Sequence, residues 1–145
     1  MERQFKTMII KRVETYKELQ DAFDVRKQVF VQEQNIPLEI EQDEHEHDSV
    51  HFVVYKNEAP IGAARIREIN REAKIERVCV VKKHRSDGVG RKLMKAIEDY
   101  AAEQKWLTIR LHAQLDVVPF YEKLGYQIES EPFYEAGIPH YAMKK

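Results

Sequence analysis

The sequence has a single cysteine, Cys79, so no disulfide can form within the chain and a zinc site built from several thiolates is excluded. Cys79 lies in an apolar stretch, and we expect a small buried side chain rather than a nucleophile. No apolar run approaches the ~20 residues that span a bilayer, and residues 1–6 are polar. These absences predict a cytoplasmic protein that does not enter a membrane.

The sequence also has no large excess of positive or negative charge. The 24 Lys and Arg residues nearly balance the 25 Asp and Glu residues, which gives a formal net charge of −1 at pH 7. A nucleic-acid-binding protein would need a basic face, and the same argument disfavours a membrane surface as partner. Internal repeats and low-complexity linkers are also absent. With 145 residues, 43% of them hydrophobic, the chain is expected to form one domain over residues 1–145.

The most informative stretch joins the apolar segment Val78–Val81 to a glycine-bearing loop and the basic start of a helix. Its residues are Arg85, Ser86, Asp87, Gly88, Val89, Gly90, Arg91 and Lys92. A strand, a tight loop and a helix in this order direct free backbone N–H groups and a positive helix dipole end at an anion, which suits a pyrophosphate. Gly88 and Gly90 allow a positive φ and a close approach of phosphate to the main chain. The alternative is an ordinary glycine turn before a surface helix.

Two known phosphate loops do not match this stretch. A Walker loop requires Lys and then Ser or Thr after its last glycine, but Arg91 follows Gly90, and a dinucleotide loop requires a third glycine where Leu93 stands. The remaining pattern, Arg/Gln-x-x-Gly-x-Gly/Ala, resembles the loop that binds the pyrophosphate of acetyl-CoA in the GNAT superfamily of N-acetyltransferases. Downstream, the phrase Phe-Tyr-Glu-Lys-Leu-Gly-Tyr at 120–126 is similar to that family's second motif.

The resemblance implies that acetyl-CoA is the acetyl donor and that no metal takes part. The pantetheine amides are expected to pair with backbone groups near Val78–Val81, and the pyrophosphate with the amides of Ser86–Arg91. The cofactor-binding candidates are therefore Val78, Cys79, Val80, Val81, Arg85, Ser86, Asp87, Gly88, Val89, Gly90, Arg91 and Lys92.

The order of predicted elements fits the same family. The predicted strands cover residues 6–12, 51–55, 61–67, 73–81, 107–112, 127–131 and 138–144. Thr15 and Glu18 form a capping box that begins the first helix, a second helix follows Gly88, and a short one ends before Gly125. The last two strands are joined by a loop that contains Pro132 and Gly137. The resemblance implies an α/β (α+β) fold with a mixed, mostly antiparallel sheet of six to seven strands, about four flanking helices, and a splay between the fourth and fifth strands that holds the cofactor.

Acyl transfer from a thioester to an amine needs a base for the amine's proton and an acid for the departing thiolate. The resemblance assigns Tyr121, in the second motif, as the acid, and the alternative is a packed tyrosine with its hydroxyl bonded to backbone. His140 is the candidate base, because it follows the rigid Pro139 in a strand expected beside the splay, and similar relatives place this His near the acetyl group. A lone His in a strand is often structural, and His112, Glu33 and loop carboxylates remain candidates.

Two charged residues, Arg26 and Glu33, interrupt the apolar stripe of the first long helix. Seven residues apart, they are expected on one helix face, where an unpaired buried charge is costly. They either pair with other core groups or bind substrate, with Arg26 suited to a carboxylate or phosphate and Glu33 to an amine. Irregular spacing argues against a metal site in the nearby set His45, His47, Asp48 and His51. A solvated loop is expected there, although its acidic run could attract a cationic amine.

Three segments narrow the resemblance to a small bacterial subgroup, the ElaA-like and YjcF-like proteins. They are residues 26–34, the acidic loop within 35–48, and the ending 137–143. That subgroup is defined largely by sequence and supplies no substrate. The sequence thus predicts an acetyl-CoA-dependent N-acetyltransferase that moves an acetyl group directly to a primary amine of a small molecule. The alternatives are a protein or peptide N-acetyltransferase and a non-catalytic acyl-CoA-binding module, and a homodimer is left open.

Overall fold

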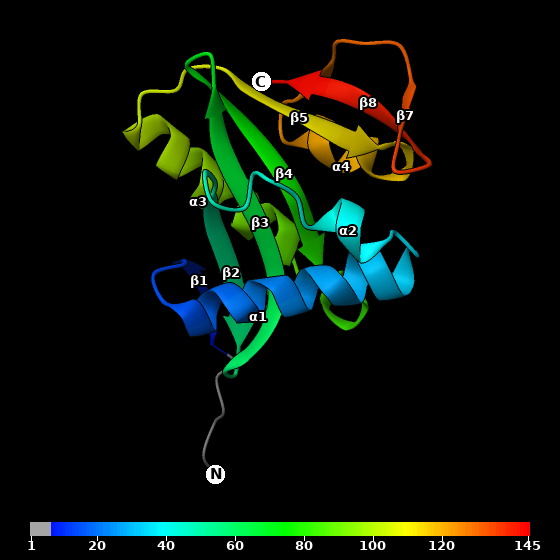
Figure 1. Ribbon diagram of the computed structural model, residues 1–145. Helices are drawn as coiled ribbons and strands as arrows, with labels where there is room; N and C mark the ends of the chain where they lie inside the picture. The colour runs from blue at the N-terminus through cyan, green and yellow to red at the C-terminus, as the bar shows by residue number, and fades with distance from the viewer. Residues whose placement is uncertain (1–6) are drawn as a thin grey trace.

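The computed structural model describes residues 7–145, which form one sheet with helices on both faces (Figure 1). Within these residues the sheet has eight strands in the order β1-β2-β3-β4-β5-β8-β6, with β7 paired to β8. All pairs are antiparallel except β4 and β5, which run parallel. The strands are β1 Met8–Arg12, β2 Val50–Lys56, β3 Ala59–Ile69, β4 Glu72–Val80, β5 Ile109–Gln114, β6 Gln127–Ile128, β7 Phe133–Glu135 and β8 Ile138–Lys144.

This mixed, mostly antiparallel sheet confirms the expected fold class, with one strand more than the six to seven that the sequence predicts. The additional strand is β7, which occupies residues assigned to the loop between Pro132 and Gly137. Three residues are too few to show a strand periodicity. The strand expected over 127–131 is also shorter, because β6 ends at Ile128.

Four α-helices, one π-helix and two 3₁₀ helices connect the strands within residues 7–145. They are α1 Tyr16–Arg26, the π-helix η1 Lys27–Glu33, α2 Leu38–Glu41, the 3₁₀ helix η2 Lys82–His84, α3 Val89–Glu103, the 3₁₀ helix η3 Leu115–Val117 and α4 Val118–Lys123. The predicted capping box begins α1: Glu18 N–H donates to Thr15 Oγ1, and Thr15 N–H donates to Glu18 Oε1, each at 3.1 Å. These bonds satisfy N–H groups that have no acceptor inside the helix.

Helices α1 and α3 pack on opposite faces of the sheet, with α1 in front and α3 behind in Figure 1. This arrangement follows from the strands, in which successive side chains point to opposite faces. Val53 of β2 lies in the core under α1 together with Val25. The next residue, Val54, lies in the other core with Leu93 and Ile97 of α3.

A β-bulge bends β4 near its C-terminal end. Two residues of β4, Arg77 and Val78, lie opposite a single residue of β3, Ala64. Arg77 has a φ of +59°, in the left-handed region that non-glycine residues rarely occupy. On its other side, β4 pairs with β5 only over Ala73–Ile75. Beyond Ile75 the two strands diverge, which confirms the predicted splay between the fourth and fifth strands (Figure 1).

Carboxylates in and after α2 are held by buried arginines rather than by solvent. Arg26 donates from Nε to Glu41 at 2.7 Å, and from Nη1 and Nη2 to Glu46 at 2.9 and 2.7 Å. Arg65 of β3 donates to both oxygens of Asp43 at 2.8 and 2.9 Å. Both arginines are 0% exposed. The expectation of a solvated acidic loop is therefore wrong for these three carboxylates, because their partners lie far away in the sequence.

Glu46 should make a measurable acid-labile contribution to stability. Burial by itself raises the pKa of this carboxyl, but hydrogen bonds and charge from Arg26 and the charge of Arg65 lower it from 4.5 to about 2. A pKa that is lower in the folded state gives stability above about pH 4.5 that is lost as the pH falls toward 2. Urea denaturation should show that the free energy of unfolding falls, because of this group, by on the order of 2 kcal/mol between about pH 6 and pH 3.

The matched variant is Glu46→Gln, which keeps the size of the side chain but cannot ionise. It should be destabilised near neutral pH, because it weakens a buried ion pair, and its unfolding free energy should fall less between the two pH values than that of the wild type. Equal pH dependence in the two proteins would contradict the assignment.

Candidate active site

A cavity of about 1020 Å³ occupies the opening between β4 and β5. Its walls come from η1 and α2 on one side of the sheet, the bulged end of β4, the start of α3, and β5, α4 and the β7–β8 hairpin. This volume is at the upper end of the range for small-ligand sites, so a donor and an acceptor could meet in it.

One end of the cavity is formed by the N-terminus of α3. Gly88, the N-cap residue, has a φ of +76°, and no side chain within residues 7–145 caps the first turn. The first N–H groups of this 15-residue helix are therefore free to bind an anion, and the helix dipole favours negative charge at the same place. Arg85, Ser86 and Arg91 line the cavity beside them.

The two glycines of the loop motif have different roles. Gly88 provides the expected left-handed turn, and a Cβ there would meet no atom of residues 7–145 within 4 Å. Gly90 lies inside α3 without a positive φ, so the positive φ expected for this glycine is wrong, and a close approach of phosphate to it stays a prediction. A Cβ on Gly90 would lie 3.1 Å from Cζ of Phe120. A side chain at this position would therefore require a small shift of the Phe120 ring.

The C-terminal half of β4 presents backbone groups to the opening. Val81 N–H donates to the carbonyl of Ile61 in β3 at 2.9 Å. Because hydrogen-bonding directions alternate along a strand, the N–H and C=O of Val80 point away from β3. The carbonyl of Val80 accepts a 2.9 Å bond from Nε of Arg85, which agrees with this direction. An extended ligand could pair with this edge as an added strand.

Eight of the twelve predicted cofactor-binding residues line the cavity: Val78, Cys79, Val80, Arg85, Ser86, Gly88, Gly90 and Arg91. The side chains of Val81, Asp87, Val89 and Lys92 lie outside its lining. Val89 is fully buried in the core, and Asp87 binds Lys56 and His84, each at 3.0 Å. For Asp87 and Val89, only a main-chain contact with a phosphate remains a prediction.

Tyr121 of α4 reaches the cavity from the side of the sheet that α3 covers. The residue is 7% exposed, and its hydroxyl has no hydrogen-bond partner in the described part of the chain. Burial raises the pKa of this phenol well above its usual value, and the nearby Cys79 adds to the effect. The hydroxyl is therefore protonated at neutral pH and free to donate into the cavity. Cys79 is buried as expected, and burial raises the pKa of its thiol to about 12.

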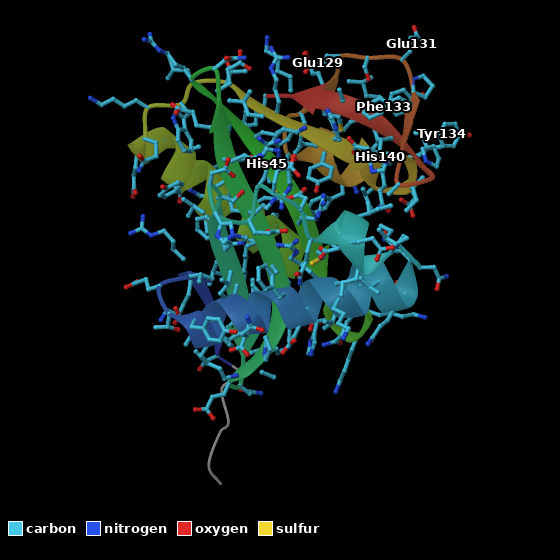
Figure 2. The ribbon with its side chains drawn as sticks, in the orientation of Figure 1. His45, Glu129, Glu131, Phe133, Tyr134 and His140 are labelled. Atoms are coloured by element: carbon cyan, nitrogen blue, oxygen red, sulfur yellow. The ribbon has the colours of Figure 1, made fainter. Side chains whose placement is uncertain are left out.

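His140 of β8 lines the same cavity from the opposite face. Its cross-strand neighbour, Gln114, shares that face and bonds to Gln34 after η1. The imidazole stacks on Phe133, with ring centres 6.1 Å apart. Figure 2 shows His140 and Phe133 close together at the β7–β8 hairpin, whereas Tyr134 points away from the hairpin. The candidate acid and the candidate base thus enter one cavity from the two faces of the sheet.

The contacts of His140 show which ring nitrogen carries the proton when the imidazole is neutral. Nδ1 lies 2.7 Å from the carbonyl oxygen of Ile138, and because a carbonyl can only accept, Nδ1 carries the proton. Nε2 then has the lone pair that a base requires. Glu135 lies 3.9 Å from this nitrogen and also bonds to Nδ1 of His112 at 2.8 Å. The sequence did not point to Glu135, because its position depends on β7, which the sequence did not predict.

The structure separates the two charged residues of the first helix. Arg26 is paired with buried carboxylates and lies outside the cavity lining. Of the two alternatives that the sequence left open, pairing in the core therefore applies to Arg26. Glu33 lines the cavity and accepts bonds of 2.7 and 2.6 Å from Arg85. The cause of the separation is η1, in which Gln34 N–H bonds to the carbonyl of Val29, five residues earlier. The wider π-helical turn rotates Glu33 away from the face of Arg26.

The polar side chains considered as a metal site, those of His45, His47, Asp48 and His51, are not arranged around a common centre. Nε2 of His51 is 2.9 Å from the carbonyl of Glu46 and faces the protein interior, whereas His45 lies 3.5 Å from Asp48. Residues 7–145 contain no group of three or more His, Cys, Asp or Glu side chains arranged to hold a metal ion. None of the helices in the same range is both long and apolar enough to cross a bilayer.

Comparison with known proteins points to one family. The acetyltransferase (GNAT) domain matches residues 11–145. The uncharacterized N-acetyltransferase YjcF of Bacillus subtilis is 52% identical over 129 residues, which cover 88% of this chain and 92% of that protein. Among solved structures, Escherichia coli ElaA has a TM-score of 0.84 at 25% identity, and an acyl-CoA N-acyltransferase from Pseudomonas aeruginosa has 0.81 at 27% identity. Each of these alignments covers 97% of this chain and 99% of the other.

The phosphate role of the loop can be tested with Gly88→Glu. A carboxylate at the uncapped start of α3 would occupy and repel the position of a phosphate, so the affinity for acetyl-CoA should fall by roughly 10² or more, measured by calorimetric titration. Gly137→Glu is the matched control, because Gly137 has a similar φ of +75° and equally open space but lies in the β7–β8 turn. It should share the backbone strain and keep wild-type affinity. Unchanged affinity in a folded Gly88→Glu protein would refute the role.

Proposed function

The chain belongs to the GNAT family of acetyltransferases, and from this premise we propose that it transfers an acetyl group from acetyl-CoA directly to the primary amine of a small molecule. One observation carries the proposal. A single cavity joins an uncapped helix N-terminus and an unpaired strand edge to a phenol and an imidazole that enter from opposite faces. These are the groups that thioester binding and proton transfer require.

The donor is assigned to the part of the cavity between β4 and the start of α3. The main-chain N–H groups of Val89–Arg91, with the side chains of Arg85 and Arg91, would hold its phosphates. The edge of Val78–Val80 would pair with its pantetheine amides. Acetyl-CoA bound in this way would supply an acetyl thioester to the cavity that Tyr121 and His140 both line.

Tyr121 and His140 are proposed to handle the two protons of the reaction. Nε2 of His140 takes a proton from the amine, directly or through one water, so that the C–N bond can form. The hydroxyl of Tyr121 gives its proton to the sulfur as the C–S bond breaks. The imidazolium that results lies 3.9 Å from Glu135, whose negative charge stabilises it.

A small acceptor is supported by the closure of the cavity wall between η1 and β5. The side-chain amides of Gln34 and Gln114 bond to each other twice, at 2.9 and 3.2 Å, and so tie these two elements together. We take this bridge across the lining to favour a small amine over a polypeptide as acceptor. The cytoplasmic location and the homodimer remain predictions.

The competing functions are acetylation of a protein or peptide and acyl-CoA binding without turnover. A free Tyr121 hydroxyl and an available His140 Nε2 favour an enzyme, since a binding module needs neither. Thiol release from acetyl-CoA in the presence of small primary amines tests the proposal. Release only with peptides would favour the first competitor, and tight binding of acetyl-CoA without release would favour the second.

Replacing Tyr121 with Phe should lower kcat by on the order of 10² to 10⁴ and leave the affinity for acetyl-CoA nearly unchanged, because the packing stays and only the proton donor is lost. Tyr126→Phe is the control. The hydroxyl of Tyr126 bonds to Glu98 at 2.7 Å, and the residue lies outside the cavity lining, so this variant should lose stability but keep kcat. Full activity in Tyr121→Phe would show that the thiolate leaves without this acid.

The pH dependence of kcat/KM should report on His140. Only the neutral imidazole can accept a proton, so the rate should rise with pH through one ionisation. His140→Ala should lose both the rate and this rising limb while acetyl-CoA still binds, and His47→Ala, a change on an exposed loop residue, should change neither. A rising limb that survives in His140→Ala would assign it to the substrate amine or to another group.

A further inference from the structure

Lys74 of β4 makes no hydrogen bond to a carboxylate within residues 7–145. It borders a charged cluster between α1 and the sheet, in which Arg26, Arg65, Arg67 and Arg77 pair with Glu41, Asp43, Glu46 and Glu76. The ammonium of Lys74 makes one ion-pair contact within residues 7–145, to Glu76 at 3.6 Å, which is too long for a hydrogen bond. That contact is to Oε2 of Glu76, while the other oxygen, Oε1, accepts from Arg65 at 3.0 Å and from Arg67 at 2.8 Å.

The ammonium lies where an acceptor would bind. Lys74 lines the cavity, and its side chain is 21% exposed. Its neighbours Ala73 and Ile75 belong to the core against α3, so the alternation of the strand directs Lys74 to the opposite face, which His140 shares. A partly buried ammonium is costly unless an anion pairs with it. The cavity therefore offers a site for an anionic group of a ligand.

Glu135 lies across the same face of the sheet and, unlike Lys74, suits a cationic or N–H-donating group of a ligand. One carboxylate oxygen accepts the bond from His112, and the other lies 3.9 Å from Nε2 of His140, too far for a hydrogen bond. The hydrogen bond from His112 is the main cause of the lowered pKa of Glu135, and the charge of Lys74 adds to it. Lys74 and Glu135 line the same cavity. The second oxygen of Glu135 makes no hydrogen bond within residues 7–145, so it is open to an N–H donor beside the candidate base.

We propose that the acceptor is a primary amine that also carries a carboxylate, an amino acid being the simplest example, with its carboxylate on Lys74 and its amine between Glu135 and His140. The assignment depends on the acetyl transfer proposed above. A neutral amine would leave Lys74 unpaired, and a polyamine would bring a second positive charge toward it. Lys74 and Glu135 are then the residues that determine acceptor specificity.

The test compares amino acids with their carboxamides, which have nearly the same shape but lack the negative charge of the carboxylate. The twenty common amino acids and β-alanine, each as acid and as amide, are assayed for CoA release, together with spermidine as a polyamine. At least one acid should exceed its amide by tenfold or more in kcat/KM, and spermidine should react more slowly than that acid. The amine of the amide loses its proton more easily, so in an assay at a pH below both amine pKa values the preference for the acid does not arise from amine reactivity.

Lys74→Gln should lower kcat/KM for the preferred acid by about 10- to 100-fold and change the value for its amide by less than about threefold, so that the preference disappears. Lys74→Arg should restore much of it. Lys95→Gln is the control, because Lys95 is exposed on α3, where it pairs with Asp99, and this variant should behave as the wild type. Calorimetry with acetyl-CoA should give the same affinity for all four proteins.

Equal rates for acids and amides, faster reaction of spermidine, or an equal loss for acid and amide in Lys74→Gln would overturn the acceptor assignment and leave acetyl transfer standing. If no compound in the panel reacts, binding of the N-acetylated amino acids decides, measured as a thermal shift. A shift with these products, but not with their amides, that is lost in Lys74→Gln supports the assignment, and the absence of any shift overturns it. Failure of the wild type to bind acetyl-CoA would remove the proposed function itself.

Discussion

The divergence of β4 from β5 is the constraint on which the rest of the structure depends. A regular β4 would continue to pair with β5 beyond Ile75 and would close the sheet. The two-residue bulge at Arg77 and Val78 bends the strand instead, with Arg77 in a left-handed conformation that costs of order 1–3 kcal/mol. Surrounding contacts hold this conformation, since the guanidinium of Arg77 donates to the carbonyl of Glu41 at 3.1 Å and pairs with Asp43 at 3.3 Å. The opening, the free edge of β4 and the cavity all follow from that bend.

The buried network of ion pairs around Arg26 and Arg65 supports the cavity wall that lies opposite the loop before α3. It joins α1, α2, β3 and β4 through Arg26 and Arg65, both fully buried. Such burial is tolerated because nearly every charge in the network is paired, and a partly satisfied network would cost more than an apolar core. Lys74 has only the 3.6 Å contact with Glu76 within residues 7–145, and it lies at the edge of the network that faces the cavity. In our proposal, this cation binds the carboxylate of the acceptor.

The sequence predicted the parts of the structure that local signals determine. The capping box at Thr15, the hairpin of β2 and β3, and the loop before α3 were all correct, because turn residues, periodicity and glycine positions encode them. The bulge at Arg77 has no such signal, and the partners of Arg26 are fixed only once β3 and the acidic segment come together. For the candidate site, Tyr121, His140 and most of the phosphate loop were named from motifs and do line the cavity. Glu135 and Lys74 could not be named, because their importance arises from packing between distant strands.

The measurement that tests the central claim most directly is a titration of ¹⁵N-labelled protein with acetyl-CoA, followed by the backbone amide signals in NMR. Our account predicts that the largest shifts fall on Val78–Val80 and on the first turn of α3, Val89–Arg91, whereas β1 and the first half of β2 stay unchanged. Protection of the same amides from hydrogen exchange should accompany the shifts, since both sets would gain hydrogen bonds. Shifts that are absent from these two segments, or that are centred on another surface, would contradict the claim that the splay between β4 and β5 is the acetyl-CoA site.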